Sequence, residues 1–204
     1  SHLWPRFEAL RRKGSYLVVY RSGSGDITSS RRLMIEVQQA VKKRLKACGY
    51  DGTFGESIMD QLIQKLSDEH GVVNWEGVFK KHRGRFRTVA EASEILKKLE
   101  AGDVRLAETV AAVLEEEGIS LLDSPEEVKR WLRQVIEHNG LQGVVFLWDE
   151  FTDFFKMDVP VTPLQELAHA TGEIPFYLFL VTHRSLNQFS RIDDETRKKL
   201  SDRF

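Results

Sequence analysis

The chain has 204 residues, of which 41% are hydrophobic, and its 30 basic and 31 acidic residues nearly cancel. This length and composition suit one domain, or one domain with a sizeable subdomain, and exclude a disordered chain. A single cysteine, Cys48, excludes a disulfide framework and fits the reducing cytosol, so we expect a cytoplasmic protein. No apolar run is as long as a membrane span, so we expect no membrane partner.

The first 28 residues predict a helix followed by a buried strand. Residues 6–13 have a helical pattern that stops at Gly14. The segment from Tyr16 to Tyr20 is an unbroken apolar run. Such a run is typical of a strand that is buried on both faces of a parallel sheet. We therefore assign residues 1–28 to the start of an α/β core.

The next stretch contains no convincing strand and predicts a block of helices. Its first helix, from Ser30 to Cys48, carries a stripe of apolar residues at helical spacing and is closed by Gly49. Further helical patterns follow at residues 58–66, 90–100 and 104–117. We assign residues 29–122 to an all-helical insertion subdomain.

The last part of the chain, residues 123–204, returns to alternating helices and strands. Ser124 and Pro125 provide a capping residue and a first-turn proline for the helix that follows them. Two apolar runs of strand length come next, at residues 143–148 and 175–181. Three such runs, separated by helical patterns, indicate a parallel sheet in an α/β fold.

The strongest candidate for chemistry is the end of the strand at residues 143–148, where Asp149 and Glu150 follow directly. A buried parallel strand holds its carboxyl end at the edge of the sheet where ligands of open α/β sheets bind. The carboxylate of Asp149 can then hold Mg²⁺ beside nucleotide phosphates. The carboxylate of Glu150 can act as the general base that activates a water. A strand that stops at a solvated acidic turn is the alternative.

The following strand ends in Thr182-His183-Arg184. An apolar strand ending in Asp-Glu, followed by a strand with a polar residue at its tip, resembles the Walker B and sensor segments of P-loop ATPases of the AAA+ type. The resemblance implies that Thr182 contacts the attacking water or the γ-phosphate. His183 is the neighbouring candidate, and Arg184 joins the implied nucleotide-binding residues. A β-branched strand residue without such a role is the alternative for Thr182.

A third segment adds to this resemblance. Residues 193–204 have a helical pattern that ends in Arg203-Phe204, and this pair resembles the AAA+ segment that carries the arginine finger. The resemblance implies that Arg203 reaches into a neighbouring subunit's site and stabilises charge on the transferred phosphoryl group, with Arg184 and Arg191 as further candidates. We therefore expect a homo-oligomer in the parent protein. An ordinary surface arginine is the alternative.

The phosphate-binding loop of this family is missing from the chain. No G-x-x-x-x-G-K-S/T motif occurs. The glycine-rich stretch at residues 22–26 lacks the lysine and the Ser/Thr, and it has the character of a turn. The chain starts at Ser1 without Met, so we expect the loop and its strand to precede Ser1 in a longer protein. These residues alone are then expected to bind ATP poorly and to be inactive as an enzyme.

Residues 80–87 form the most basic segment and are a candidate for contact with DNA or RNA. Such a cluster can neutralise phosphates while Phe86 stacks on a base. A solvated loop between helices is the alternative. The cations of the segment that we assign to this contact are Lys80, Lys81, Arg83, Arg85 and Arg87.

We therefore expect an α/β fold with a partial P-loop NTPase-like core of parallel strands, without the phosphate-loop strand, and with a large all-helical insertion. The resemblance implies a module that binds ATP and Mg²⁺, hydrolyses ATP, and couples this turnover to remodelling of a protein or nucleic acid. The alternative is a non-catalytic α/β module that binds a protein or a nucleic acid through its helical block.

Overall fold

Three parallel strands form the sheet of the protein. The computed structural model describes residues 15–68, 71, 73–86, 91–183 and 198. Within them lie β1 (Tyr16–Ser22), β2 (Gly143–Asp149) and β3 (Phe176–Leu180), in the spatial order β1-β2-β3. The central strand β2 pairs in parallel with both neighbours. The prediction of an α/β fold with a parallel sheet is confirmed.

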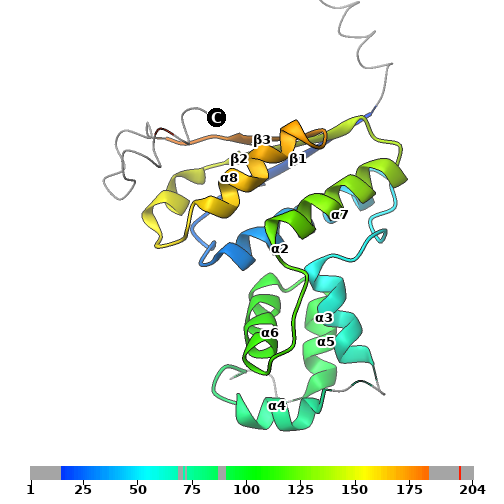
Figure 1. The fold of residues 1–204 in the computed structure, drawn as a ribbon, viewed down its shortest axis with the longest axis vertical. Coiled ribbons are helices and arrows are strands. Elements are labelled where there is room, and N and C mark those ends of the chain that lie inside the picture. The colour runs from blue at the N-terminus through cyan, green and yellow to red at the C-terminus, as the bar shows by residue number, and fades with distance from the viewer. Residues whose placement is uncertain (1–14, 69–70, 72, 87–90, 184–197, 199–204) are drawn as a thin grey trace, which may run out of the picture.

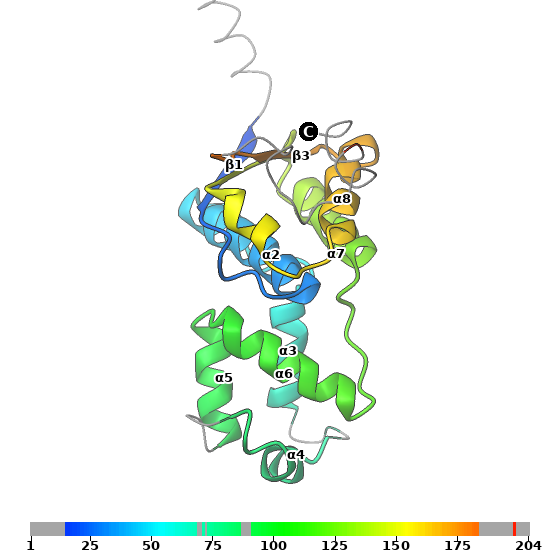
Figure 2. The same ribbon diagram turned by 90° about the vertical axis from the view of Figure 1, so that its left-hand side faces the viewer.

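Helices connect the strands and form two groups (Figures 1 and 2). The helices α2, α7 and α8 lie against one face of the sheet, whereas α3, α4, α5 and α6 form a bundle farther from it. Among the described residues, no helix is both long and apolar enough to cross a membrane. The helical elements are α2 (Ser30–Ala47), α3 (Ile58–Ser67), α4 (Trp75–Lys81), α5 (Ala92–Glu100), α6 (Val104–Glu116), α7 (Pro125–His138), the 3-10 helix η1 (Phe151–Lys156), α8 (Thr162–His169) and the 3-10 helix η2 (Ala170–Gly172).

Residues at the helix ends explain where the predicted helices begin and stop. The Ser124 side chain accepts a hydrogen bond from the backbone N–H of Glu127, and Pro125 lies in the first turn of α7. The helix α2 ends just before Gly49, whose φ of +77° lies in the left-handed region that glycine adopts at low cost. Both predicted boundaries are confirmed.

The helix α2 joins the sheet to the helical bundle. The sequence pattern places it in the insertion, because no strand follows it before residue 143. In the structure α2 packs against both β1 and α6. Its consecutive residues Leu33, Met34 and Ile35 are all buried, as expected for a helix with neighbours on more than one side. The bundle that lies away from the sheet therefore begins with α3.

The sheet is buried on one face only, as far as the described residues extend. Leu17 and Val19 of β1 are each 1% exposed, and Trp148 of β2 is fully buried. On the other face, Tyr20 of β1 is 63% exposed. The prediction that β1 is buried on both faces is therefore wrong for the part of the chain that the structure describes. The reason is that α2, α7 and α8 all lie on the same side of the sheet (Figure 2).

Gly143, at the start of β2, has no room for a side chain. A Cβ there would lie 2.5 Å from the backbone oxygen of Pro175, and this oxygen is fixed because it accepts the N–H of Val144 at 2.8 Å. We expect Gly143→Ala to lower the free energy of unfolding by about 1–3 kcal/mol, because the strands must move apart. Urea unfolding measures the change.

Gly172→Ala is the matched control for this substitution. A Cβ at Gly172 would meet nothing within 4 Å, so the free energy of unfolding should stay the same or rise slightly, by less than about 1 kcal/mol. Equal losses of stability in the two variants would contradict the close approach of β2 and Pro175.

Candidate functional site

Two hydroxyl residues of β1 hold two carboxylates at the carboxyl end of β2. The parallel register pairs Ser22 with Asp149, so the two strands end at the same edge of the sheet. The Tyr20 hydroxyl donates a hydrogen bond to Oδ2 of Asp149 at 3.1 Å, and the Ser22 hydroxyl donates to Oε2 of Glu150 at 2.8 Å. Asp149 is half-buried and Glu150 is exposed. We call Asp149, Glu150 and these two hydroxyls the acidic edge.

Tyr20 acts in this arrangement as a neutral donor. The hydrogen bond to the Asp149 carboxylate is the largest cause that raises the pKa of Tyr20 above its usual value, and the charge of Asp149 adds to it. An ionised phenol would place a second negative charge beside the carboxylate, so the neutral form is favoured. Tyr20 therefore keeps its proton and fixes one oxygen of Asp149.

The backbone turn at Glu150 is strained and held in place. Glu150 has φ 54° and ψ 37°, and among the described residues it is the one non-glycine residue with a positive φ. Oδ1 of Asp149 accepts its N–H at 2.8 Å, and the buried Ser24 hydroxyl donates to its carbonyl at 3.3 Å. Ser24 also accepts the N–H of Phe154 at 2.9 Å. Left-handed backbone of this kind concentrates at functional sites, where surrounding contacts maintain it.

We expect Ser24→Ala to lower the free energy of unfolding by about 1–3 kcal/mol, because the N–H of Phe154 would be left buried without its acceptor. Thermal or urea unfolding measures this loss. Ser22→Ala is the matched control, since it removes an exposed hydroxyl and should change stability by less than about 0.5 kcal/mol. A loss in Ser24→Ala no larger than in Ser22→Ala would contradict the role of Ser24 in holding the turn.

The glycine-rich stretch after β1 forms a turn that is hydrogen-bonded to β2. Gly23 donates its N–H to the Asp149 carbonyl at 2.9 Å, and its own carbonyl accepts from Nε1 of Trp148 at 2.7 Å. The guanidinium of Arg21 lies 4.6 Å from the centre of the Trp148 ring and pairs with Asp26 at 2.9 Å. Burial opposes the ionisation of Asp26, but the hydrogen bond and the charge of Arg21 outweigh it, so the pKa of Asp26 is lowered. The predicted turn is present.

The residues after β3 run along the same edge of the sheet. The Val181 carbonyl accepts the N–H of Phe151 at 2.9 Å, and the N–H of His183 donates to Oγ1 of Thr152 at 2.9 Å. Thr182 lies between these two contacts and is half-buried. The structure therefore brings Thr182 and His183 beside the turn that contains the two carboxylates. The predicted cations Arg184, Arg191 and Arg203 lie outside the described residues.

The acidic edge offers one half-buried carboxylate to a metal ion. In the described ranges of the chain, no three His, Cys, Asp or Glu side chains form a metal site by themselves. Mg²⁺ in nucleotide sites is usually held by one or two carboxylates together with phosphate oxygens and water. Asp149 fits such shared coordination, because its carboxylate can accept more than its two present hydrogen bonds.

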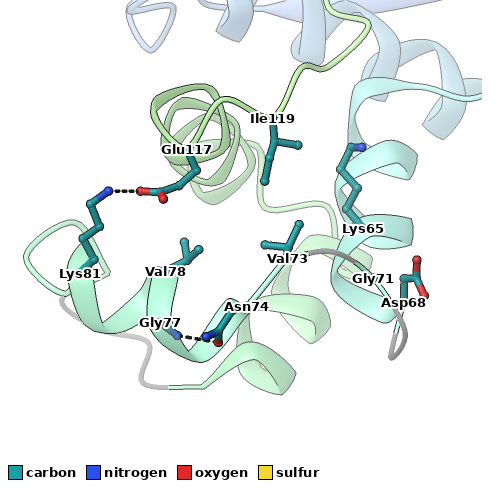
Figure 3. Close-up of a pocket in the computed structure, with 10 residues that line it drawn as sticks. All are labelled: Lys65, Asp68, Gly71, Val73, Asn74, Gly77, Val78, Lys81, Glu117 and Ile119. Carbon is teal, nitrogen blue, oxygen red and sulfur yellow. Dashed lines mark hydrogen bonds and ion pairs between the residues drawn. The ribbon is translucent and has the colours of Figure 1, made fainter.

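A cavity of about 690 Å³ lies elsewhere, in the helical bundle (Figure 3). It is bordered by the end of α3, by α4 and by residues after α6, and Lys81 pairs with Glu117 beside it at 2.7 Å. This volume is within the range of small-molecule sites. Neither Asp149 nor Glu150 lines it, so the cavity is separate from the acidic edge.

The basic segment is partly neutralised by the end of α6. Lys81 and His82 contact Glu117 at 2.7 and 2.6 Å, and Arg85 pairs with Glu116 at 2.6 Å. Cations that are paired within the protein attract phosphates less than unpaired ones do. Contact of this segment with DNA or RNA stays a prediction. The attraction for phosphates would then come mainly from cations of the segment other than Lys81 and Arg85.

Phe86 is not free to stack on a base. It is 5% exposed and packs edge-to-face against Phe79, with the ring centres 5.1 Å apart. The prediction that Phe86 stacks on a base is therefore wrong, because the ring belongs to the core of the helical bundle. Lys80 and Arg83 are exposed, whereas Arg87 lies outside the described residues.

The sequence pattern alone does not identify Tyr20, Ser22 and Ser24 as residues of the site. They contact partners more than a hundred positions away in the chain. A signal was nevertheless present, since hydroxyl residues recur at every second position from 20 to 24. Such alternation at the end of a strand predicts that these side chains point to the same side.

Comparison with known proteins adds no assignment to this site. No protein-family model matches the chain, no curated protein matches it, and no solved structure matches it. The inference about function therefore depends on the residues and the geometry of the acidic edge.

Proposed function

We propose that this chain supplies the hydrolysis half of an ATPase of the AAA+ P-loop type, which couples ATP turnover to remodelling of a protein or nucleic-acid partner. The acidic edge carries this proposal. Asp149 ends the central strand and Glu150 follows it, hydroxyls of β1 orient both carboxylates, and Thr182 lies just after the adjacent strand β3. ATP hydrolysis requires a carboxylate for the metal ion, a group that orients or activates water, and polar contacts to the phosphates.

Glu150 is the general base in this proposal. Its carboxylate is exposed, so a water can approach it. The Ser22 hydroxyl holds Oε2 at 2.8 Å, which leaves Oε1 to accept a proton from the attacking water. A base must lie within hydrogen-bond reach of the proton that it removes, and the fixed turn at Glu150 limits how far its carboxylate can move.

Asp149 is the residue that would hold Mg²⁺. Its orientation comes from the Tyr20 hydroxyl and from the N–H of Glu150, so the carboxylate is positioned before a ligand arrives. When bound, Mg²⁺ supplies positive charge beside the phosphate oxygens. Thr182 is the candidate to orient the water or the γ-phosphate, and Arg203 of a neighbouring copy is the candidate finger.

The strand order limits where a phosphate-loop strand could pair in this proposal. β1, β2 and β3 follow one another across the sheet in chain order, so the described sheet has no point at which the order reverses. Ligands of open α/β sheets bind at such a point, outside the carboxyl ends of the strands. An additional strand that comes before β1 in the chain could pair with β1 or with β3. Pairing with β1 would continue the chain order, whereas pairing with the outer edge of β3, beside Thr182, would create a point of reversal. We propose this place for the phosphate-loop strand.

Mg²⁺-dependent ATP hydrolysis by the longest parent chain tests the proposed activity. We expect phosphate release that stops when EDTA removes the metal ion. We also expect the 204 residues alone to bind ATP poorly. Micromolar ATP affinity of this chain by itself, in a calorimetric titration, would contradict a phosphate loop outside it.

A non-catalytic binding module is the second candidate, and the cavity in the helical bundle and the exposed Lys80 and Arg83 favour it. It predicts a parent chain that neither binds nor hydrolyses ATP. If the partner is DNA or RNA, affinity should fall steeply with salt and should weaken when Lys80 and Arg83 are replaced by Ala. The double variant Lys43→Ala and Lys97→Ala removes the same charge at other exposed positions and is the control.

A further inference from the structure

The backbone just after β3 is held at three points by the end of β2 and by the residues that follow β2. The N–H of Val181 donates to the Trp148 carbonyl at 2.9 Å, and the Val181 carbonyl accepts the N–H of Phe151 at 2.9 Å. Two residues further on, the N–H of His183 donates to Oγ1 of Thr152 at 2.9 Å. The chain is therefore fixed for three residues beyond the end of β3.

The third of these contacts uses a side chain because the backbone of the partner strand has turned away. β2 ends at Asp149, and the left-handed turn at Glu150 leads the chain into the 3-10 helix η1. A strand continues the hydrogen bonds of a sheet only while its backbone stays extended. The hydroxyl oxygen of Thr152 therefore takes the place of a backbone acceptor and extends the pairing of the two segments to His183.

The surroundings of Thr152 fix the position of this oxygen. Thr152 is only 7% exposed, so its side chain is packed on nearly all sides, and a β-branched side chain has few rotamers to choose from. His183, whose N–H it accepts, is by contrast exposed. Thr152 also follows Glu150 by two positions in the same turn. One short segment thus carries both the candidate general base and the oxygen that anchors the backbone beside Thr182.

We propose that Thr152 is a positioning residue, which fixes Thr182 relative to Glu150 by holding the N–H of His183. Thr182 lies between two anchored neighbours, Val181 and His183, so its backbone cannot shift far while both contacts hold. A displacement of about 1 Å in a reacting arrangement can lower a rate about 100-fold. This role rests on the proposed ATPase activity, and it needs no contact between Thr152 and the nucleotide.

Loss of the Thr152 hydroxyl should affect catalysis more than folding. Because His183 is exposed, its N–H can bond to water when the acceptor is removed, so no buried donor is left without a partner. Valine keeps the branched shape of threonine and removes only the hydroxyl. We therefore expect Thr152→Val to shift the melting temperature of the parent chain by less than about 4 °C.

Steady-state ATP hydrolysis by the parent chain tests the role of the hydroxyl. We expect Thr152→Val to lower kcat at least about tenfold while KM for ATP stays within about twofold, because orientation and not binding is lost. Thr152→Ser keeps the oxygen and should stay within about threefold of the wild-type kcat. Thr109→Val is the matched control, since it removes a hydroxyl that donates to the Arg105 carbonyl at 3.1 Å in α6 and should leave kcat unchanged.

A double-mutant cycle tests whether Thr152 acts through Thr182. Thr182→Ala alone should lower kcat, and adding Thr152→Val to it should lower kcat by less than about twofold more, because the side chain to be positioned is already gone. Losses that multiply in the double variant would show that Thr152 acts independently of Thr182 and would overturn the proposal. Equal losses in Thr152→Val and Thr152→Ser would also overturn it, because the effect would then not come from the oxygen.

The wild-type parent chain separates this role from the proposed activity. If the wild type does not hydrolyse ATP, the proposed activity fails and the role of Thr152 fails with it. If the wild type is active and Thr152→Val keeps its kcat, only the role of Thr152 fails. Amide hydrogen exchange in the absence of ATP tests the contact itself. The N–H of His183 should exchange at least about fivefold faster in Thr152→Val than in the wild type or Thr152→Ser, and equal exchange rates in all three would overturn the proposal.

Discussion

Glu150→Gln is expected to lower the rate of ATP hydrolysis by the parent chain at least about 100-fold while ATP binding stays nearly unchanged. The amide has the shape of the carboxylate but cannot accept the proton of the attacking water. The Ser22 hydroxyl can still donate to an amide oxygen at the place of Oε2, so the local geometry is retained. Steady-state phosphate release and equilibrium binding of a fluorescent ATP analogue measure the two quantities.

Asp153→Asn is the matched control for this variant. Asp153 is an exposed carboxylate three residues further along the chain, and it pairs with Lys156 at 2.6 Å. Its loss should change the hydrolysis rate by less than about threefold, since a charge outside the site affects the reaction only weakly. A Glu150→Gln rate within about threefold of the wild type would show that Glu150 is not the general base.

Trp148→Ala is expected to lower the free energy of unfolding by about 3–5 kcal/mol. Trp148 is fully buried, and its ring packs against Phe146 and Phe151 with centres 5.5 and 4.9 Å apart. Its indole N–H also donates to the Gly23 carbonyl. Truncation to alanine therefore leaves a cavity beside β2 and removes a bond that holds the turn after β1.

Urea unfolding followed by circular dichroism measures this loss. Leu122→Ala, at a position that is 52% exposed, should change stability by less than about 0.5 kcal/mol and is the control. Trp148→Phe keeps most of the apolar volume and should fall between the two. A loss below about 1 kcal/mol in Trp148→Ala would contradict a central place for β2 in the core.

The strands and most helices can be predicted because local patterns specify them. β2 and β3 are short apolar runs, and α7 begins at a capping residue, Ser124. The sequence pattern does not predict α4 and α8. The helix α4 has seven residues and contains Gly77, and α8 has Pro163 in its first turn and no side-chain cap. Helices this short are stabilised by packing against the rest of the fold, which local propensity does not reveal.

The candidate site likewise contains residues that a local sequence pattern identifies and residues that only the fold brings together. Asp149 and Glu150 are adjacent in the chain, so a local pattern identifies them. Ser22 contacts Glu150 across 128 positions, and only the parallel register of β1 and β2 places them together. Phe86 shows the opposite case, because its sequence neighbours are cations while its ring is buried against Phe79. A local sequence pattern does not show which distant segments of the chain contact one another.

Calorimetric titration of the longest parent chain with ATP, with and without Mg²⁺, tests most directly whether the acidic edge serves a nucleotide. We predict binding that is stronger with Mg²⁺, and an Asp149→Ala variant in which the effect of Mg²⁺ is lost because its protein ligand is gone. No nucleotide binding by the folded parent chain, with or without Mg²⁺, would contradict the ATPase proposal and would favour a binding module that acts through the helical bundle.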